Sequence, residues 1–288
     1  MNHETGYLNR IKNEKIYYQS WLPDDKNKAQ ANIVLVHGLG SHSGWYNELA
    51  HKLVAHNYNA YGLDLYGHGR SSGQRGHINS WADYRQNVDY FVDWVRSQYV
   101  DKPIFILGHS LGGLITLDYV LRFSPSIAGL GVMAPALGKV TVSPVKVLIG
   151  KLLSWIYPRF SLNVGISDSA SSHYSEIVKA YKTDPLRHRR VTARFGTEYF
   201  KTTKWMEENL DRLNSPILIL QGDEDSVTPP ECTQELFNQL PDIDKQYKIY
   251  EGAYHDLHHD TCETIVIEDI IHWFDQKCPL KTRIYQNK

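Results

Sequence analysis

The most informative part of the sequence runs Ile104-Phe105-Ile106-Leu107-Gly108-His109-Ser110-Leu111-Gly112-Gly113. Four apolar residues lead into a G-x-S-x-G pentapeptide, and residues 114–121 continue with helical periodicity. This pattern predicts a buried strand, a tight turn that carries Ser110, and a helix packed behind the strand. Such a turn makes the serine hydroxyl project near the positive end of the helix. Ser110 is therefore a candidate nucleophile.

On either side of this segment, apolar runs alternate with amphipathic ones. The apolar runs predict strands at residues 31–36, 58–63, 104–107, 127–133, 217–221 and 246–250. The amphipathic runs predict helices at residues 47–56, 81–98, 114–121, 229–240 and 264–275. Two further strands, 7–10 and 15–21, fit an antiparallel hairpin that opens the sheet. The alternation implies an α/β fold with a mostly parallel central sheet and helices on both faces.

The alternation stops between residues 136 and 205, where no strand pattern is evident and the segment reads as helical. We therefore expect residues 136–205 to form an inserted helical cap, or lid. Such a cap would lie over the C-terminal edge of the sheet, where ligands bind in α/β folds. The core would then comprise residues 1–135 and 206–288.

Composition narrows the functional class and the compartment. The chain has 288 residues, 42% of them hydrophobic and 22% charged, which suits one large domain with an insertion or two small domains. A formal net charge of −1 argues against a nucleic-acid partner, which needs a clustered basic face. Three cysteines at irregular spacing predict free thiols in a reducing compartment. Because the polar N-terminus lacks a signal-peptide pattern and no apolar run is long enough to span a membrane, we expect a cytoplasmic protein.

A serine nucleophile needs a base, and the base needs a group that orients it. Two residues lie where these partners should be, each in the loop directly after a predicted strand: Asp225 and His255. The order serine, acid, histidine is typical of the α/β-hydrolase arrangement. Asp223 is a rival acid, although its place nearer the strand end favours a turn role.

Three other patterns have competing interpretations. The histidine-rich segment 255–260 suggests a metal site, but a second ligand cluster is lacking, so we expect neither a metal nor a cofactor. The glycine- and serine-rich loop 64–73 lacks a phosphate-binding pattern and is interpreted as a structural corner. His37, His68 and His109 are expected to hydrogen-bond loops around the site.

Several motifs together resemble the monoacylglycerol lipase and lysophospholipase family of α/β-hydrolases. They are His37-Gly38-Leu39-Gly40, Gly67-His68-Gly69-Arg70-Ser71, Gly108-His109-Ser110-Leu111-Gly112-Gly113, Gly222-Asp223-Glu224-Asp225, Gly252-Ala253-Tyr254-His255 and the segment 178–186. The resemblance covers nearly the whole chain. It implies Ser110 as nucleophile, Asp225 as acid and His255 as base, with the backbone N–H groups of Leu39 and Leu111 as the oxyanion hole. It also implies hydrolysis of an ester of a single-chain lipid, a monoacylglycerol or a lysophospholipid.

The cap supplies a hint about the substrate. Residues 145–156 place an apolar stripe at helical spacing, flanked by lysines and Trp155. Two interpretations stay open: the stripe lines a tunnel for the acyl chain, or it packs the cap onto the core. On the first, Leu148, Leu152 and Trp155 are candidate substrate-binding residues, and the outer face of the helix could contact a membrane peripherally.

Other functions share this scaffold. An aminopeptidase or amide hydrolase would need an acidic cap pocket, and residues 136–205 are not rich in acids. An acyltransferase would use the same three residues. A non-catalytic binding protein would usually lack one of them, whereas all three are present here. The sequence does not indicate an oligomeric state.

Overall fold

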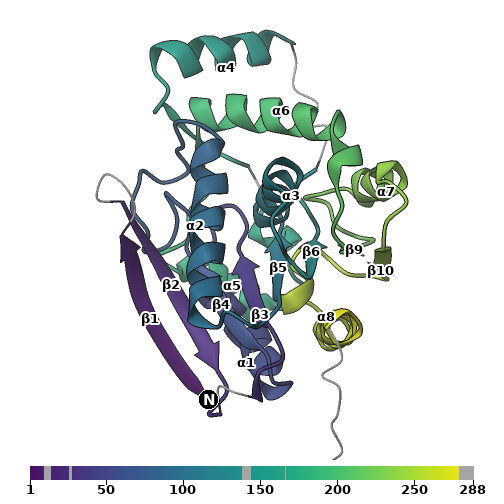
Figure 1. Cartoon of the computed structure of the whole chain (residues 1–288). Coiled ribbons are helices and arrows are strands. Elements are labelled where there is room, and N and C mark those ends of the chain that lie inside the picture. Colours follow the sequence, from purple (N-terminus) through teal and green to yellow (C-terminus); the bar gives the residue numbers. More distant parts are fainter. Residues whose placement is uncertain (10–13, 26–27, 138–143, 166, 279–288) are drawn as a thin grey trace, which may run out of the picture.

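An eight-stranded sheet runs through the molecule in the order β1-β2-β4-β3-β5-β6-β9-β10 (Figure 1). The computed structural model describes residues 1–9, 14–25, 28–137, 144–165 and 167–278, except the side chains of residues 144–147. The strands are β1 (Asn2–Asn9), β2 (Lys15–Leu22), β3 (Asn32–Val36), β4 (Asn59–Leu63), β5 (Ile104–His109), β6 (Gly129–Met133), β9 (Ile217–Gly222) and β10 (Lys245–Tyr250). β1 pairs antiparallel with β2, and β2 with β4, whereas every pair from β4 to β10 is parallel. The predicted mostly parallel sheet is confirmed.

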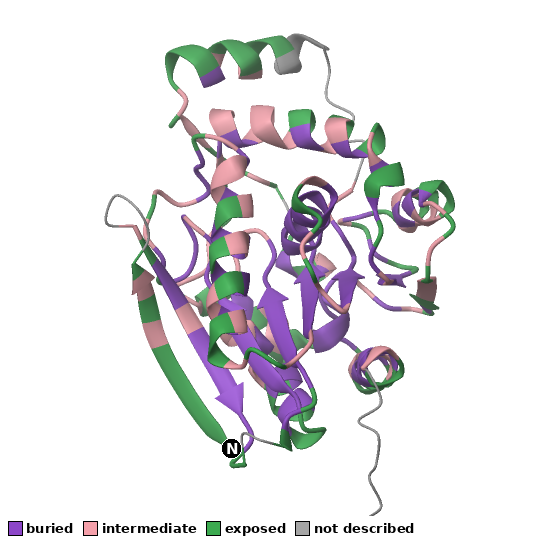
Figure 2. Cartoon of the chain, in the orientation of Figure 1, coloured by how far each residue is buried: buried purple, intermediate pink, exposed green. Residues whose placement is uncertain are grey.

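Helices cover both faces of the sheet, and its central strands are therefore buried on both sides (Figure 2). α2 (Ala82–Gln98) and α3 (Leu111–Phe123) pack on one face with α7 (Pro230–Gln239). α1 (Asn47–Ala55) and α8 (Glu263–Lys277) pack on the other. Short 3₁₀ turns lie at Ser43–Tyr46, Asp168–Ala170, Leu210–Arg212 and Leu257–His259. None of the described helices combines the length and apolar character needed to cross a bilayer.

The segment between β6 and β9 holds α4 (Pro144–Ile156), β7 (Ser161–Asn163), α5 (Ser175–Thr183), β8 (Arg190–Thr192) and α6 (Ala193–Glu207). α4 packs on α6 and is the outermost layer at that end of the molecule (Figure 1). The expectation of no strands here was wrong, because β7 and β8 pair antiparallel in a sheet of their own. Strands of three residues are too short to show an alternating pattern. The expected boundary at residue 205 falls inside α6.

The part of this segment after α5 is tied to the core at several points. Asp184 Oδ2 accepts hydrogen bonds from Trp45 Nε1 at 2.9 Å and His42 Nε2 at 2.8 Å. The backbone N–H of His188 donates to the carbonyl of Gly40 at 3.0 Å, and that of Thr192 donates to Gly76 at 3.1 Å. Residues 184–192 are therefore held directly against the loops that follow β3 and β4.

The opening hairpin is longer than predicted. β1 begins at Asn2 rather than residue 7 and pairs residue by residue with β2 as far as Asn9. Its first residues are polar and exposed, since β1 is an edge strand with solvent on its outer side, so they lack an apolar alternation. Arg10, the predicted end of this strand, lies outside the described residues.

Candidate active site

Ser110 sits at the turn between β5 and α3 in a backbone conformation that L-residues rarely adopt, with φ 53° and ψ −118°. The turn can be this tight because glycines flank it. A Cβ atom on Gly112 would lie 2.1 Å from the carbonyl oxygen of Val36, and one on Gly108 would lie 2.5 Å from that of Gly112. The strained turn presents the hydroxyl of Ser110 at the C-terminal edge of the sheet.

Ser110, His255 and Asp225 form a chain of hydrogen bonds. His255 Nε2 lies 2.9 Å from Ser110 Oγ, and His255 Nδ1 lies 2.8 Å from Asp225 Oδ2. Since the carboxylate can only accept, Nδ1 carries the proton and Nε2 is free to accept from the serine hydroxyl. All three residues are buried, so this series of hydrogen bonds is shielded from bulk water. The structure brings together the three residues that the sequence selected.

Asp225 is fixed by several donors besides His255. Its Oδ1 accepts from the backbone N–H groups of Val227 at 2.8 Å and Thr228 at 2.9 Å. Its Oδ2 accepts from the Thr228 hydroxyl at 2.7 Å and from Gln221 Nε2 at 3.0 Å. Burial alone would raise the pKa of the Asp225 carboxyl, but His255 and the Thr228 donors outweigh burial and lower the pKa to about 2.

The rival acid, Asp223, does not reach the histidine. It is exposed and accepts a hydrogen bond from the backbone N–H of Gly252 at 2.7 Å. That is the turn role expected from its position. Gln221 and Thr228 were missed by the sequence reasoning. Gln221 could have been found, because it is a polar residue in an otherwise apolar strand buried throughout.

The electrostatics of His255 favour its role as a base. Burial alone would lower the pKa of this imidazole, but the charge of Asp225, its hydrogen bond and the charge of Asp256 raise it above its ordinary value. The raised pKa makes His255 a stronger proton acceptor, which suits proton removal from a serine hydroxyl.

The loop after β3 and the first turn of α3 each provide a candidate oxyanion donor. Leu39 lies in this loop and lines the cavity at Ser110, and Leu111 is the first residue of α3, where a helix leaves its N–H group without an internal partner. His37 braces the loop: its Nε2 accepts from the Leu65 N–H at 2.9 Å and its Nδ1 donates to the Gly38 carbonyl at 2.8 Å. Burial lowers the pKa of His37 to about 4, so it is neutral as these bonds require.

The other two histidines expected around the site also bond to loops. His68 Nδ1 lies 3.0 Å from the carbonyl oxygen of Tyr66, and His109 Nε2 lies 3.2 Å from that of His255. The expectation of a supporting role is therefore confirmed for His37, His68 and His109.

A cavity of about 70 Å³ adjoins Ser110 and His255. Core residues such as Leu39, Tyr46 and Asp256 form one part of its wall, and residues of the inserted segment, including Tyr181 and Arg187, form another. A ligand in this cavity would thus contact both parts of the chain.

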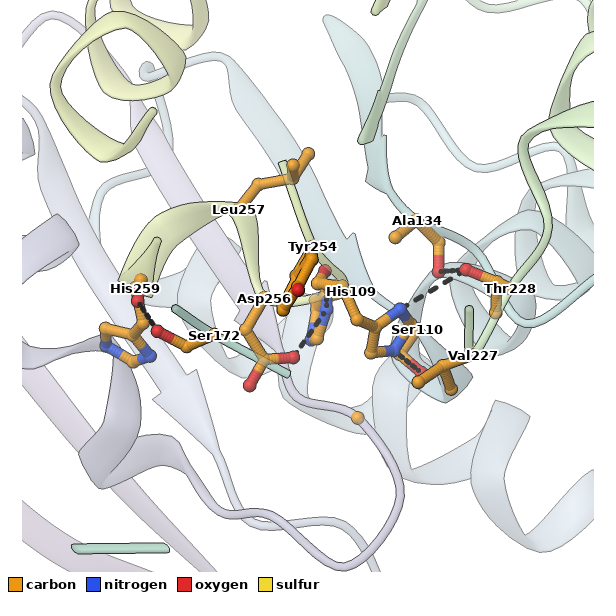
Figure 3. Close-up of polar contacts among 12 residues, drawn as sticks. His109, Ser110, Ala134, Ser172, Val227, Thr228, Tyr254, Asp256, Leu257 and His259 are labelled. Carbon is orange, nitrogen blue, oxygen red and sulfur yellow. Dashed lines mark hydrogen bonds and ion pairs between the residues drawn. The ribbon is translucent and has the colours of Figure 1, made fainter. Parts of the chain in front are cut away.

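One group of side chains has the composition of a metal site. His109, His255 and Asp256 offer potential ligand atoms that all lie within 4.8 Å of one another (Figure 3). Each is already engaged: His255 bonds Ser110 and Asp225, and His109 bonds its neighbours. His258 instead stacks on Tyr46 with ring centroids 4.9 Å apart. His109 and His255 therefore already have hydrogen-bond partners within the protein.

The cap residues selected from the sequence do not reach this cavity. Leu148, Leu152 and Trp155 are 69%, 54% and 79% exposed, and none lines the cavity at Ser110. The apolar stripe of residues 145–156 was expected to face inward, but α4 packs on α6 with Leu148, Ile149, Leu152 and Ile156 exposed to solvent. The side chain of Val145 lies outside the described ones.

Comparison with known proteins gives consistent results. The profile of the family described as "Serine aminopeptidase, S33" matches residues 27–262. The monoglyceride lipase of Mus musculus is 32% identical over 267 residues, covering 91% of this chain and 87% of the mouse protein. The monoacylglycerol lipase of Mycolicibacterium smegmatis is 29% identical over 261 residues, covering 90% and 92%. The crystal structure of Paleococcus ferrophilus monoacylglycerol lipase matches with a TM-score of 0.82 at 31% identity, covering 91% of this chain and 99% of that chain.

Proposed function

This chain belongs to the serine aminopeptidase S33 family of α/β-hydrolases, and from that premise we propose that it cleaves the ester bond of single-chain lipids, monoacylglycerols above all. It is a carboxylic ester hydrolase by its similarity to monoacylglycerol lipases. The observation that carries the proposal is the buried chain from Ser110 Oγ through His255 to Asp225. Lysophospholipids are the second substrate class that fits a single acyl chain.

In the proposed reaction, His255 removes the proton of Ser110 as its Oγ attacks the ester carbonyl. Asp225 keeps the proton of the imidazole on Nδ1 and stabilises the imidazolium that forms. His255 then gives the proton to the leaving alcohol, which departs and leaves an acyl-serine. A water molecule, activated by His255 in the same way, releases the fatty acid and restores Ser110. This sequence of steps requires no cofactor.

The negative charge that develops on the carbonyl oxygen needs donors. We assign this role to the backbone N–H groups of Leu39 and Leu111. In support, Leu111 follows Ser110 directly and its N–H opens α3, so the helix dipole also favours an anion there. Each such donor is worth about 3 kcal/mol of transition-state stabilisation.

The inserted segment, residues 136–205 in the proposed division, would act as the cap, and α4 would contact the lipid surface. α4 is the outermost layer at its end of the molecule (Figure 1), and its apolar side chains Leu148, Leu152 and Trp155 are exposed, as is Lys151. Apolar side chains next to a lysine suit the boundary between head groups and acyl chains. Peripheral contact of this kind would bring the enzyme to its insoluble substrate.

The test is hydrolysis of p-nitrophenyl esters of graded acyl length beside Ser110→Ala, followed by monoacylglycerol and lysophospholipid. We expect activity to peak at medium or long chains and to vanish in the variant. Activity confined to acetate and butyrate would refute the lipid assignment but keep the three residues. If only p-nitroanilides are cleaved, the protein is an amide hydrolase and the proposal is wrong.

A further inference from the structure

Besides Asp225, a second buried carboxylate acts on His255: that of Asp256. Asp256 follows His255 directly in the chain, is only 6% exposed, and lines the cavity at Ser110. Figure 3 shows its side chain reaching His109 rather than solvent. The proposed reaction gives it no step, although a buried carboxylate is costly to maintain.

The neighbours of Asp256 include a neutral histidine and one arginine, Arg187, whose charge acts on it from the same cavity. Its Oδ1 lies 3.4 Å from His109 Nε2, and burial lowers the pKa of His109 to about 4, so this partner is neutral. Burial alone would raise the pKa of the Asp256 carboxyl, but His109, His255, a hydrogen bond from Tyr181 and the charge of Arg187 lower it, which keeps the group ionised. No described lysine or arginine forms an ion pair with it.

The carboxylate therefore has spare capacity as an acceptor. Its two oxygens offer about four acceptor positions, and His109 and Tyr181 account for two. A strong acceptor that faces a cavity with unused positions is suited to a ligand that donates hydrogen bonds.

Arg187 supplies the opposite charge in the same cavity. It comes from the inserted segment, and its guanidinium lies 3.8 Å from the ring centroid of Tyr181 and 5.8 Å from that of Trp45. Stacking on two rings holds the guanidinium in place while its N–H groups remain donors. Asp256 and Arg187 thus give one small cavity both a fixed acceptor and a fixed donor.

We propose that Asp256 and Arg187 determine specificity for the leaving alcohol, and that they select an uncharged alcohol with free hydroxyl groups, a polyol such as glycerol. The inference rests on the proposed function, because it concerns the alcohol of the same ester. A hydroxyl group both donates and accepts, so neighbouring hydroxyls of a polyol can satisfy both residues at once.

The position of Asp256 places this selection on the alcohol side. His255 must protonate the leaving oxygen, so the alcohol lies next to His255, and Asp256 is its neighbour in the chain. Charged head groups fit less well. A cation attracted by Asp256 would be repelled by Arg187, and an anion attracted by Arg187 would be repelled by Asp256, since both residues line the cavity.

The experiment compares three octanoate esters that differ only in the alcohol: 1-octanoylglycerol, ethyl octanoate and octanoylcholine. We expect the wild type to favour the glyceryl ester in kcat/KM. Asp256→Asn should reduce the ratio of glyceryl to ethyl ester by roughly 10- to 100-fold, the loss expected for hydrogen bonds to a charged acceptor. Glu224→Gln, which removes an exposed carboxylate near Asp225, is the matched control and should keep the wild-type ratio.

The outcomes distinguish failure of this inference from failure of the proposed function. A wild type inactive on all three esters refutes the proposed function. If the wild type is active and Asp256→Asn keeps the wild-type ratio, only the role of Asp256 is refuted. The same holds if Asp256→Asn lowers kcat/KM equally for the glyceryl and ethyl esters. A preference of the wild type for octanoylcholine would show a cation site and also overturn the inference.

A second measurement needs no variant of Asp256, in case that variant fails to fold. Glycerol, added to the wild type during hydrolysis of p-nitrophenyl octanoate, should inhibit at lower concentration than choline chloride does. Arg187→Gln should weaken the inhibition by glycerol. Equal inhibition by glycerol and choline would contradict a site that selects hydroxyl groups.

Discussion

Replacing Asp225 by Asn tests the site at the residue that carries the most contacts. The substitution keeps the shape of the side chain but turns one acceptor oxygen into a donor NH₂ group. If that group takes the place of Oδ2, it faces three donors at once: His255 Nδ1, the Thr228 hydroxyl and Gln221 Nε2. The easiest relief is for His255 to move its proton to Nε2, where it can no longer accept from Ser110.

The size of both effects follows from the structure. Loss of the correct imidazole tautomer should lower kcat roughly 10⁴-fold, as in other serine hydrolases with an Asp-to-Asn change. For stability, the carboxyl has a pKa of about 2 against an ordinary 3.8. This difference stabilises the folded state above the ordinary pKa and is lost as the pH falls toward 2, so an uncharged Asn should cost roughly 2 kcal/mol at neutral pH.

The assay is p-nitrophenyl octanoate hydrolysis together with urea unfolding at pH 7. Asp223→Asn is the matched control, since Asp223 lies two residues away and its side chain accepts from the Gly252 N–H rather than from His255. The control should retain activity within a few-fold. If Asp225→Asn keeps more than a tenth of the wild-type kcat, or if Asp223→Asn is the variant that loses it, the assignment of the acid is wrong.

Three further outcomes are expected. Acidification should unfold the protein between pH 6.5 and 4, because His37, His109 and His188 have a pKa of about 4 in the folded state and stay neutral while the unfolded chain takes up protons. Each of them would lower the free energy of unfolding by up to about 1.4 kcal/mol per pH unit, measurable by urea titration. Gly112→Ala should abolish folding or activity, seen by circular dichroism and ester hydrolysis, because the added methyl would meet the Val36 carbonyl at 2.1 Å. Trp155→Ser should leave stability within about 0.5 kcal/mol, since the side chain is 79% exposed, yet weaken sedimentation with lipid vesicles; unchanged sedimentation would contradict membrane contact through α4.

The sequence was most predictive where local chemistry is strict. The strand, the strained turn at Ser110 and the helix behind it are determined by apolar runs and by glycines that tolerate close backbone approach. Asp225 and His255 could be selected because each follows a strand of the same parallel sheet, and such strands end at one edge. The positions of Asp223 and Asp225 in the turn were enough to predict which of them has a turn role and which lies beside His255.

Long-range packing was beyond the sequence. Nothing local distinguishes an apolar helix that faces a tunnel from one that rests on a second helix, so the sequence left both interpretations of residues 145–156 open, and in the structure Leu148 and Leu152 are exposed and do not line the cavity at Ser110. Asp256 was considered only for a metal, because its place beside the cavity depends on how the 255–260 segment folds over His109. The cytoplasmic location and the limits of the cap stay predictions.

The contacts of residues 184–192 with the core divide the inserted segment into two parts of unequal freedom. The part that touches Gly40, Trp45 and Gly76 shares hydrogen bonds with the loop that carries Leu39, one of the two proposed oxyanion donors. α4, in contrast, meets α6 and solvent. We therefore expect substitutions on the outer helix α4 to disturb the geometry around Ser110 less than substitutions in residues 184–192 do.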